Sequence, residues 1–310
     1  MTVLEKAGAM IDAIPSNVRG MFMMTLAAGI AASMHAVVRH TAETDMHPFE
    51  IFFFRQLIAI ALLLPVFMKI GMDELKTERP YTHIARGAFQ TVGGMTWFWA
   101  LSILPLAKVT ALNLSTALFA VLGAILFLGE KPDSKRTFAL LFGFAGVMVV
   151  VRPGVEIISL GVVLVLASRI FSATGKVIAK SLAGTERTPT IVLYTACTIA
   201  VLSFIPSLFV WVWPTWEQMA LICVIGFLGA LVQLCIIRAY KLGDVGAVEP
   251  FSFFRLVFAS LWGFVFFAEI PSIWIWVGGT MIVFAGSYLA KSENDAGRKA
   301  QKQHAAATPD

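Results

Sequence analysis

Long apolar stretches separated by short polar segments run along most of the chain. Most of them hold about 17 to 25 residues, the length an α-helix needs to cross a hydrocarbon layer of about 30 Å. Strands of a membrane barrel would be about ten residues long and would alternate in polarity. Because backbone polar groups in lipid must be hydrogen-bonded within the protein, the pattern predicts transmembrane α-helices.

The stretches predict ten helices, each with a boundary error of a few residues. Their short connections indicate one membrane domain, and the expected fold class is an all-α integral membrane protein. We place the helices at residues 18–39, 48–69, 84–104, 107–128, 135–151, 158–180, 188–210, 217–239, 244–268 and 272–290.

The composition agrees with a membrane environment. The sequence has 58% hydrophobic and 14% charged residues, whereas soluble domains have roughly one-half and one-quarter. The lipid bilayer is therefore the expected surrounding of most of the chain. Cys197, Cys223 and Cys235 lie inside apolar stretches without the spacing of a metal or redox site, so we interpret them as packing residues.

The net charge of +5 is better explained by orientation in the membrane than by nucleic-acid binding. If both termini are cytoplasmic, the outer segments hold only Arg39, Lys108 and Arg152, which is the positive-inside pattern. We therefore expect a multi-pass protein of the bacterial inner membrane with both termini cytoplasmic and no nucleic-acid partner. The inner segments would hold Lys6, Arg19, Lys69, Lys76, Arg79, Arg86, Lys131, Lys135, Arg136, Lys180, Arg187, Arg238, Lys241, Lys291, Arg298, Lys299 and Lys302.

The two halves of the chain resemble each other. The segment TALFAVLGAILFLGEKP at 116–132 resembles RLVFASLWGFVFFAEIP at 255–271, so that Glu130 matches Glu269. Each half holds five helices, an odd number, so the second copy must be inverted in the membrane, as in many secondary transporters. Other matches follow in the same order: Pro48 with Pro189, His35 with Lys176, Arg39 with Lys180, and Phe144-Ala145-Gly146 with Phe284-Ala285-Gly286.

These matches divide the chain into two five-helix repeats, residues 18–154 and 155–290. Residues 1–17 are expected to form a cytoplasmic N-terminal segment, because they lack the features of a cleaved secretory signal. Residues 291–310 are polar and rich in alanine, which predicts a disordered cytoplasmic tail.

The end of the fourth stretch reads F-L-G-E-K-P and is followed by a short basic turn and F-A-G-V-M-V-V-V-R-P-G. This pattern resembles the drug/metabolite transporter superfamily, EamA type, and the resemblance covers about residues 18–290. It departs in the second copy, where Ala268-Glu269 replaces the frequent Gly-Glu. The resemblance implies a membrane carrier with a central cavity formed by both repeats. It does not supply the substrate, because members carry amino acids, nucleotide sugars, purines, organic acids, vitamins and cationic drugs.

Ionisable residues inside the apolar stretches are the candidate functional residues. A charge near the bilayer centre costs about 2.5–3.5 kcal/mol on insertion scales and normally faces protein or a watery cavity. The cations outnumber the single acid, Glu249. The expected substrate cavity comprises Arg55, Arg169, Lys176 and Arg255, with His35, Gln56, Gln90, Trp97 and Asn113 as polar or aromatic companions.

Each of these cations has alternative interpretations. Arg55 suits bidentate binding of a carboxylate or phosphate, or it pairs structurally with Glu249 or with helix-end carbonyls. Arg169 lies midway along its helix, where a long side chain cannot easily reach water, and cavity exposure is favoured. Lys176 lies nearer the inner end and either lines the cavity or reaches the interface. Arg255 follows Glu249 by six residues, on a different helix face, so each needs another partner.

Glu249 is the candidate for proton or cation coupling. It precedes Pro250, which removes one backbone hydrogen bond and opens the turn before it; a kink with a structural ion pair is the alternative. His35 titrates near neutrality, although packing is the commoner role of such a histidine. Glu130 and Glu269 lie at helix ends and are interpreted as structural or gating elements.

Three functions follow from these residues. The leading hypothesis is secondary active transport of a small organic anion by alternating access, because cations predominate in the membrane core. The second hypothesis keeps the carrier but assigns it a zwitterionic or cationic amine or amino acid, bound by Glu249 and aromatic residues. The third is a membrane-embedded enzyme.

The sequence lacks the motifs that the third hypothesis, a membrane-embedded enzyme, would need. It has no G-x-S-x-G, no H-E-x-x-H and no His/Cys/Asp cluster, and it has no phosphate-cradling loop for ATP-driven pumping. We expect no enzymatic activity, no catalytic residue, no cofactor and no metal site. Gly93-Gly94 and Gly278-Gly279 permit close helix packing, either within one chain or in a homodimer.

Overall fold

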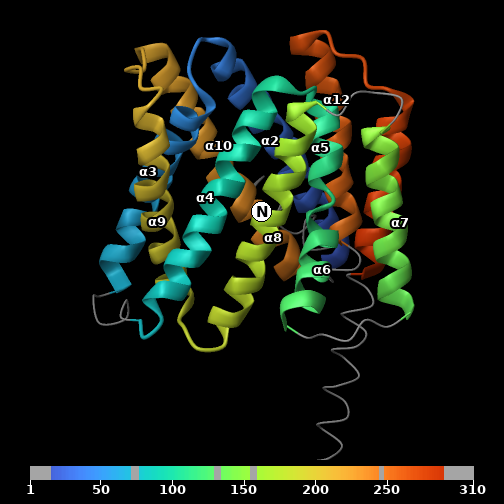
Figure 1. Cartoon of the computed structure of the whole chain (residues 1–310), viewed down its shortest axis with the longest axis horizontal. Helices are drawn as coiled ribbons and strands as arrows, with labels where there is room; N and C mark the ends of the chain where they lie inside the picture. The colour runs from blue at the N-terminus through green and yellow to red at the C-terminus, as the bar shows by residue number, and fades with distance from the viewer. Residues whose placement is uncertain (1–14, 71–76, 129–133, 154–158, 244–247, 290–310) are drawn as a thin grey trace, which may run out of the picture.

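The computed structural model describes residues 15–70, 77–128, 134–153, 159–243 and 248–289. The expectations for most of the N-terminal segment, for Glu130 and for the C-terminal tail lie outside these residues. The helices run side by side in one bundle (Figure 1). They are α2 (Ser16–Glu43), α3 (Pro48–Ile70), α4 (Pro80–Ile103), α5 (Leu106–Asn113), α6 (Thr116–Leu128), α7 (Ser134–Val151), α8 (Leu160–Ala183), α9 (Thr188–Leu208), α10 (Trp216–Leu242), the 3₁₀ helix η2 (Glu249–Phe253), α12 (Phe254–Phe267) and a last helix, Ile273–Leu289.

The described helices form ten membrane spans, because α5 and α6 share the fourth span and η2 and α12 share the ninth. Large apolar side chains such as Phe204, Phe227 and Phe264 are exposed on the bundle, as expected where lipid is the solvent. The prediction of an all-α integral membrane protein is confirmed. Within the described ranges, six segments are long and apolar enough to cross a membrane: Ser16–Glu43, Leu106–Gly123, Leu160–Ala179, Thr190–Leu208, Trp216–Leu242 and Glu249–Phe267.

The packing of the spans follows the two-repeat pattern. Counting five spans per repeat makes α8, α9 and α10 the counterparts of α2, α3 and α4. Helix α2 packs on α10 as α8 packs on α4, and α12 packs on α2 as α6 packs on α8. Likewise α4 contacts α9 as α10 contacts α3. These three pairs of contacts are related by the inversion that the odd number of spans per half predicts.

The fourth and ninth spans are both interrupted, at nearly equivalent positions. We expected continuous helices at 107–128 and 244–268, but α5 ends at Asn113 and α12 begins only at Phe254. At the first break, the Ser115 and Thr116 hydroxyls donate to the carbonyls of Leu112 and Asn113, both at 2.6 Å. These local hydrogen bonds compete with the helical ones. At the second break, Pro250 lies in the 3₁₀ turn η2 and has no N–H to donate to a helical hydrogen bond.

The glycine pairs pack within the chain. A Cβ on Gly146 of α7 would lie 2.9 Å from the carbonyl oxygen of Gly278, so the fifth and tenth spans cross in close contact. A Cβ on Gly93 would lie 2.9 Å from the hydroxyl of Ser172 on α8. Both close approaches need glycine and join spans of the same chain.

Candidate functional site: a central cavity

A cavity of about 260 Å³ lies between α2, α3, α4, α5, α8 and α9. Six of the nine residues predicted to bind substrate line it, and they come from four different spans: Arg55, Gln56, Gln90, Trp97, Asn113 and Arg169. The remaining lining residues are Met34, Phe52, Gly93, Gly94, Phe98, Ser172 and Ile199.

Arg169 is held firmly by hydrogen bonds across the break in the fourth span. Its guanidinium donates to the side chains of Asn113, Thr116 (3.3 Å) and Ser168 (2.6 Å). It also lies over the Trp97 ring, 4.3 Å from the centroid. Asn113 ends α5 and Thr116 begins α6, so Arg169 ties the two half-helices together as well as lining the cavity.

Arg55 has very different surroundings. Its Nε is buried without a hydrogen-bond partner, and among the described residues its guanidinium forms no hydrogen bond or ion pair. The group lies 5.8 Å from the Phe98 ring centroid. It packs against the backbone of α10, where a Cβ on Gly229 would lie 3.2 Å from Nη2. Arg55 therefore does not form the structural ion pair with Glu249 that was the alternative, although both residues are described.

The other three predicted cavity residues lie outside the lining. His35 is 5% exposed, its Nδ1 has no hydrogen-bond partner, and its ring meets Trp97 edge-on at 5.3 Å. It therefore lies behind the cavity wall. Arg255 occupies the first turn of α12 with a buried, unpartnered Nε. Lys176 has an exposed side chain on α8.

Glu249 lies in the 3₁₀ turn η2 of the ninth span, directly after the helical residue Val248. Its carboxylate accepts a hydrogen bond of 2.5 Å from the phenol of Tyr240, and it is not among the residues that line the cavity. Sequence reasoning placed it inside a helix over residues 244–268, of which residues 244–247 lie outside the described part.

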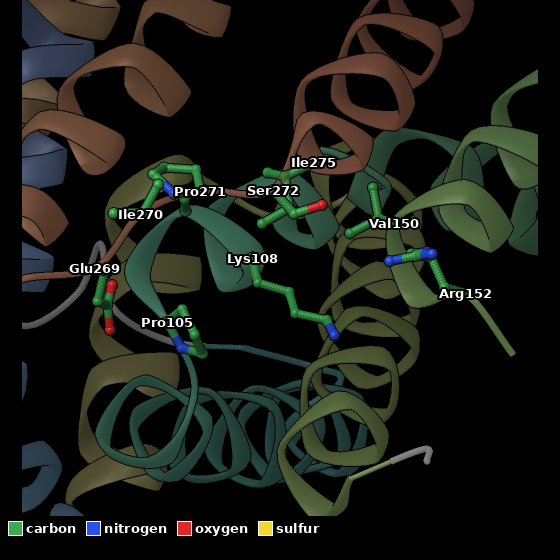
Figure 2. Close-up of a pocket in the computed structure, with 10 residues that line it drawn as sticks. Pro105, Lys108, Val150, Arg152, Glu269, Ile270, Pro271, Ser272 and Ile275 are labelled. Atoms are coloured by element: carbon green, nitrogen blue, oxygen red, sulfur yellow. The ribbon is translucent and has the colours of Figure 1, made fainter. Parts of the chain in front are cut away.

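A second cavity, of about 280 Å³, lies at the end of the bundle that carries Arg39, called here the Arg39 end. Figure 2 shows Lys108 and Arg152 reaching toward a common space, with Glu269 beside Pro105 on the other side. Arg152 lies 5.1 Å from the centroid of the Trp274 ring. The sequence pattern placed Glu269 at a helix end, as a structural or gating element.

Glu269 forms an ion pair with Arg39 of α2, and its other oxygen accepts the Leu106 N–H at 2.9 Å. Arg39 also donates to the Leu104 carbonyl at 3.2 Å. The one available signal in the sequence was that Arg39 is among the few cations predicted on the outer side. Among the described residues no group of three His, Cys, Asp or Glu side chains could hold a metal ion.

Ten spans in two inverted repeats around a polar central cavity define a membrane transporter of the inverted-repeat class. Residues 18–152 match the EamA-like transporter family. The riboflavin transporter of Brucella anthropi is 30% identical over 254 residues, which cover 80% of this chain and 89% of that protein. The chain belongs to the EamA-like transporter family.

Other relatives extend over most of the chain. The S-adenosylmethionine uptake transporter of Rickettsia bellii is 28% identical, covering 89% of this chain and 94% of that protein. The pseudopaline exporter CntI of Pseudomonas aeruginosa is 27% identical, covering 88% and 96%. A solved crystal structure has the same fold, with a TM-score of 0.59 at 18% identity over 89% of this chain and 98% of that one.

Proposed function

We propose that this protein is a secondary carrier that moves a small organic anion across the membrane by alternating access through the central cavity. The observation that carries the proposal is Arg55, a cavity-lining guanidinium with a buried Nε that lacks a hydrogen-bond partner. A buried cation without a partner is costly. A bound carboxylate or phosphate offsets that cost with two parallel charge-assisted hydrogen bonds.

The remaining lining suits the uncharged part of such a substrate. The side-chain amides of Gln56, Gln90 and Asn113 offer both donors and acceptors. The rings of Phe52 and Phe98 supply apolar walls against which a planar group can stack. Few polar groups set in an apolar lining are typical of a small-molecule site.

The names of the relatives guide the choice of test compounds. They include transporters of S-adenosylmethionine and of riboflavin and an exporter of pseudopaline. S-adenosylmethionine carries a carboxylate together with an ammonium, a sulfonium and an adenine ring, whereas riboflavin carries a planar ring system and no carboxylate. Riboflavin therefore tests ring stacking without a carboxylate, and malate, which has no ring and no cationic group, tests the carboxylate alone. An amine substrate bound by Glu249 is less well supported, since that carboxylate does not line the cavity.

The same proposal includes the placement of the protein in the membrane. The distribution of Lys and Arg favours a bacterial inner membrane with both termini in the cytoplasm, so that the Arg39 end faces outward. Coupling to a proton or a cation is assigned to Glu249, in the 3₁₀ turn of the ninth span.

The proposal is tested by thermal unfolding of the purified protein in detergent. Malate, S-adenosylmethionine, riboflavin and choline are added separately, because a ligand at 100 times its dissociation constant adds about 2.7 kcal/mol of apparent stability. We expect stabilisation by a carboxylate compound that is lost in Arg55→Gln and kept in Arg238→Gln. Arg238 is an exposed residue of α10, so its replacement controls for loss of charge. Stabilisation by choline alone, or equal stabilisation of all three proteins, contradicts the proposal.

A further inference from the structure

The two interrupted spans are restrained to different degrees. Arg169 bridges the break of the fourth span by bonding Asn113 on one side and Thr116 on the other. The ninth span has no such bridge in the described part of the chain, where the guanidinium of Arg255 forms no hydrogen bond. Helix α12 therefore lacks the hydrogen-bonded bridge across its break that fixes the fourth span.

The outer half of α12 is held to α2 along a polar seam. Midway along, the Trp262 indole donates to the Ser33 hydroxyl at 3.0 Å. Just beyond the end of α12, the Glu269 carboxylate pairs with Arg39, whose guanidinium also lies 4.4 Å from the Phe267 ring centroid. Both members of the pair are mostly buried, at 17% and 13% side-chain exposure.

The backbone at the end of α12 aims Glu269 into this pair. Ala268 adopts the left-handed conformation with φ 51°, and the Glu269 N–H returns to the Gly263 carbonyl at 3.0 Å. The carboxylate then lies over Gly263, where a Cβ would be 2.8 Å from Oε2. A left-handed alanine carries strain, so the chain maintains an unfavourable backbone conformation at the residue that directs this carboxylate.

We propose that the Arg39–Glu269 ion pair is a gate that closes the central cavity at the Arg39 end, and that the gate opens by tilting of α12. This inference rests on the transport function proposed above but not on the class of substrate. The Leu106 amide, at the start of α5, adds a third partner to the closed pair. An opened gate separates α2, α5 and α12, the three elements that the pair joins.

The gate is tested by labelling a cysteine in the cavity, without any substrate. Ser172, which lines the cavity, is replaced by Cys after Cys197, Cys223 and Cys235 have been replaced by Ala. A membrane-impermeant maleimide is applied to right-side-out and to inside-out vesicles. With Glu269→Gln, we expect labelling from one side to accelerate about tenfold, which corresponds to a loss of about 1.4 kcal/mol from the closed state.

Two further variants make the result specific. Glu43→Gln is the matched control, because Glu43 also contacts Arg39, at 3.5 Å, but is half-exposed and lies on the same helix. We expect no acceleration in that variant. The charge reversal Arg39→Glu with Glu269→Arg is expected to restore slow labelling.

Acceleration in right-side-out vesicles also places the Arg39 end outside, and acceleration in inside-out vesicles supports the gate with the opposite orientation. Unchanged labelling of Glu269→Gln from both sides overturns the gate, and so does equal acceleration by Glu43→Gln. Because no substrate is added, these results stand whether or not a carboxylate compound stabilises the protein.

Discussion

The Gly229→Ala substitution separates fold stability from ligand binding. The new Cβ would lie 3.2 Å from Nη2 of Arg55 and 3.5 Å from the sulfur of Met34. The first distance is tighter than an ordinary contact, so the guanidinium must move by a few tenths of an ångström. Arg55 is the residue proposed to bind the anion, so the displacement acts directly on the charge-assisted hydrogen bonds.

The expected magnitudes have opposite signs. Alanine is favoured over glycine inside a helix by up to about 1 kcal/mol, so the ligand-free protein keeps or gains stability. A hydrogen bond to a charged group contributes about 1.5–3 kcal/mol. Losing part of it, about 1 kcal/mol, weakens binding about fivefold.

The assay is isothermal titration with the compound that stabilises the protein in thermal unfolding. Gly123→Ala is the matched control, because a Cβ there meets only Val177, at an ordinary distance of 3.4 Å. Weaker binding in Gly229→Ala, with unchanged binding in Gly123→Ala, is the expected outcome. Equal affinities in all three proteins would refute the placement of the anion against Arg55.

Three further predictions concern the structure around the site. Replacing Arg169 with Leu leaves Asn113 and its neighbours without their donor and should destabilise the ligand-free protein by about 1–3 kcal/mol, whereas Arg55→Leu should not; thermal unfolding of both variants decides this. Ala268→Gly removes left-handed strain of about 1–2 kcal/mol from the folded state, but it adds about 0.4–1 kcal/mol of conformational entropy to the unfolded chain. The free energy of unfolding should therefore rise by about 0.5–1 kcal/mol, and a lower unfolding temperature contradicts this. Burial lowers the pKa of His47, which accepts the Phe49 N–H on Nδ1 at 3.2 Å, while Glu50 opposes the shift. The stabilising effect of neutral His47 is therefore full above pH 6.5 and is lost as the pH falls below that value. His47→Asn should flatten the fall in unfolding temperature between about pH 7 and pH 5.

The spans could be read from the sequence because lipid imposes a strong constraint on length and polarity. The interruptions could not, since they depend on competition between local hydrogen bonds. Ser115 and Thr116 are compatible with a helix, and at the break the amides of Leu114 and Ser115 donate to carbonyls three residues back, while the two hydroxyls bond the carbonyls of Leu112 and Asn113. Pro250 gave a signal for the second interruption, where the chain forms the 3₁₀ turn η2.

The candidate cavity residues were recognised by the cost of placing polar groups in lipid. That argument found Arg55 and Arg169 together but could not separate them. The difference lies in the partners: Arg169 bonds Asn113, Thr116 and Ser168, whereas Arg55 bonds no described residue. The Arg39–Glu269 pair joins residues far apart in the chain, so sequence spacing offered no indication of it.

The most direct test of the central claim is substrate protection of the central cavity. The Ser172→Cys variant, without the three native cysteines, is incorporated into liposomes and labelled with a thiol reagent in the presence of increasing malate, S-adenosylmethionine or riboflavin. If the cavity beside Arg55 is the transport site, a transported compound slows the labelling at the concentrations that half-saturate its uptake, and Arg55→Gln abolishes both effects. Uptake that saturates while the introduced thiol remains fully reactive would place the substrate elsewhere and contradict the account.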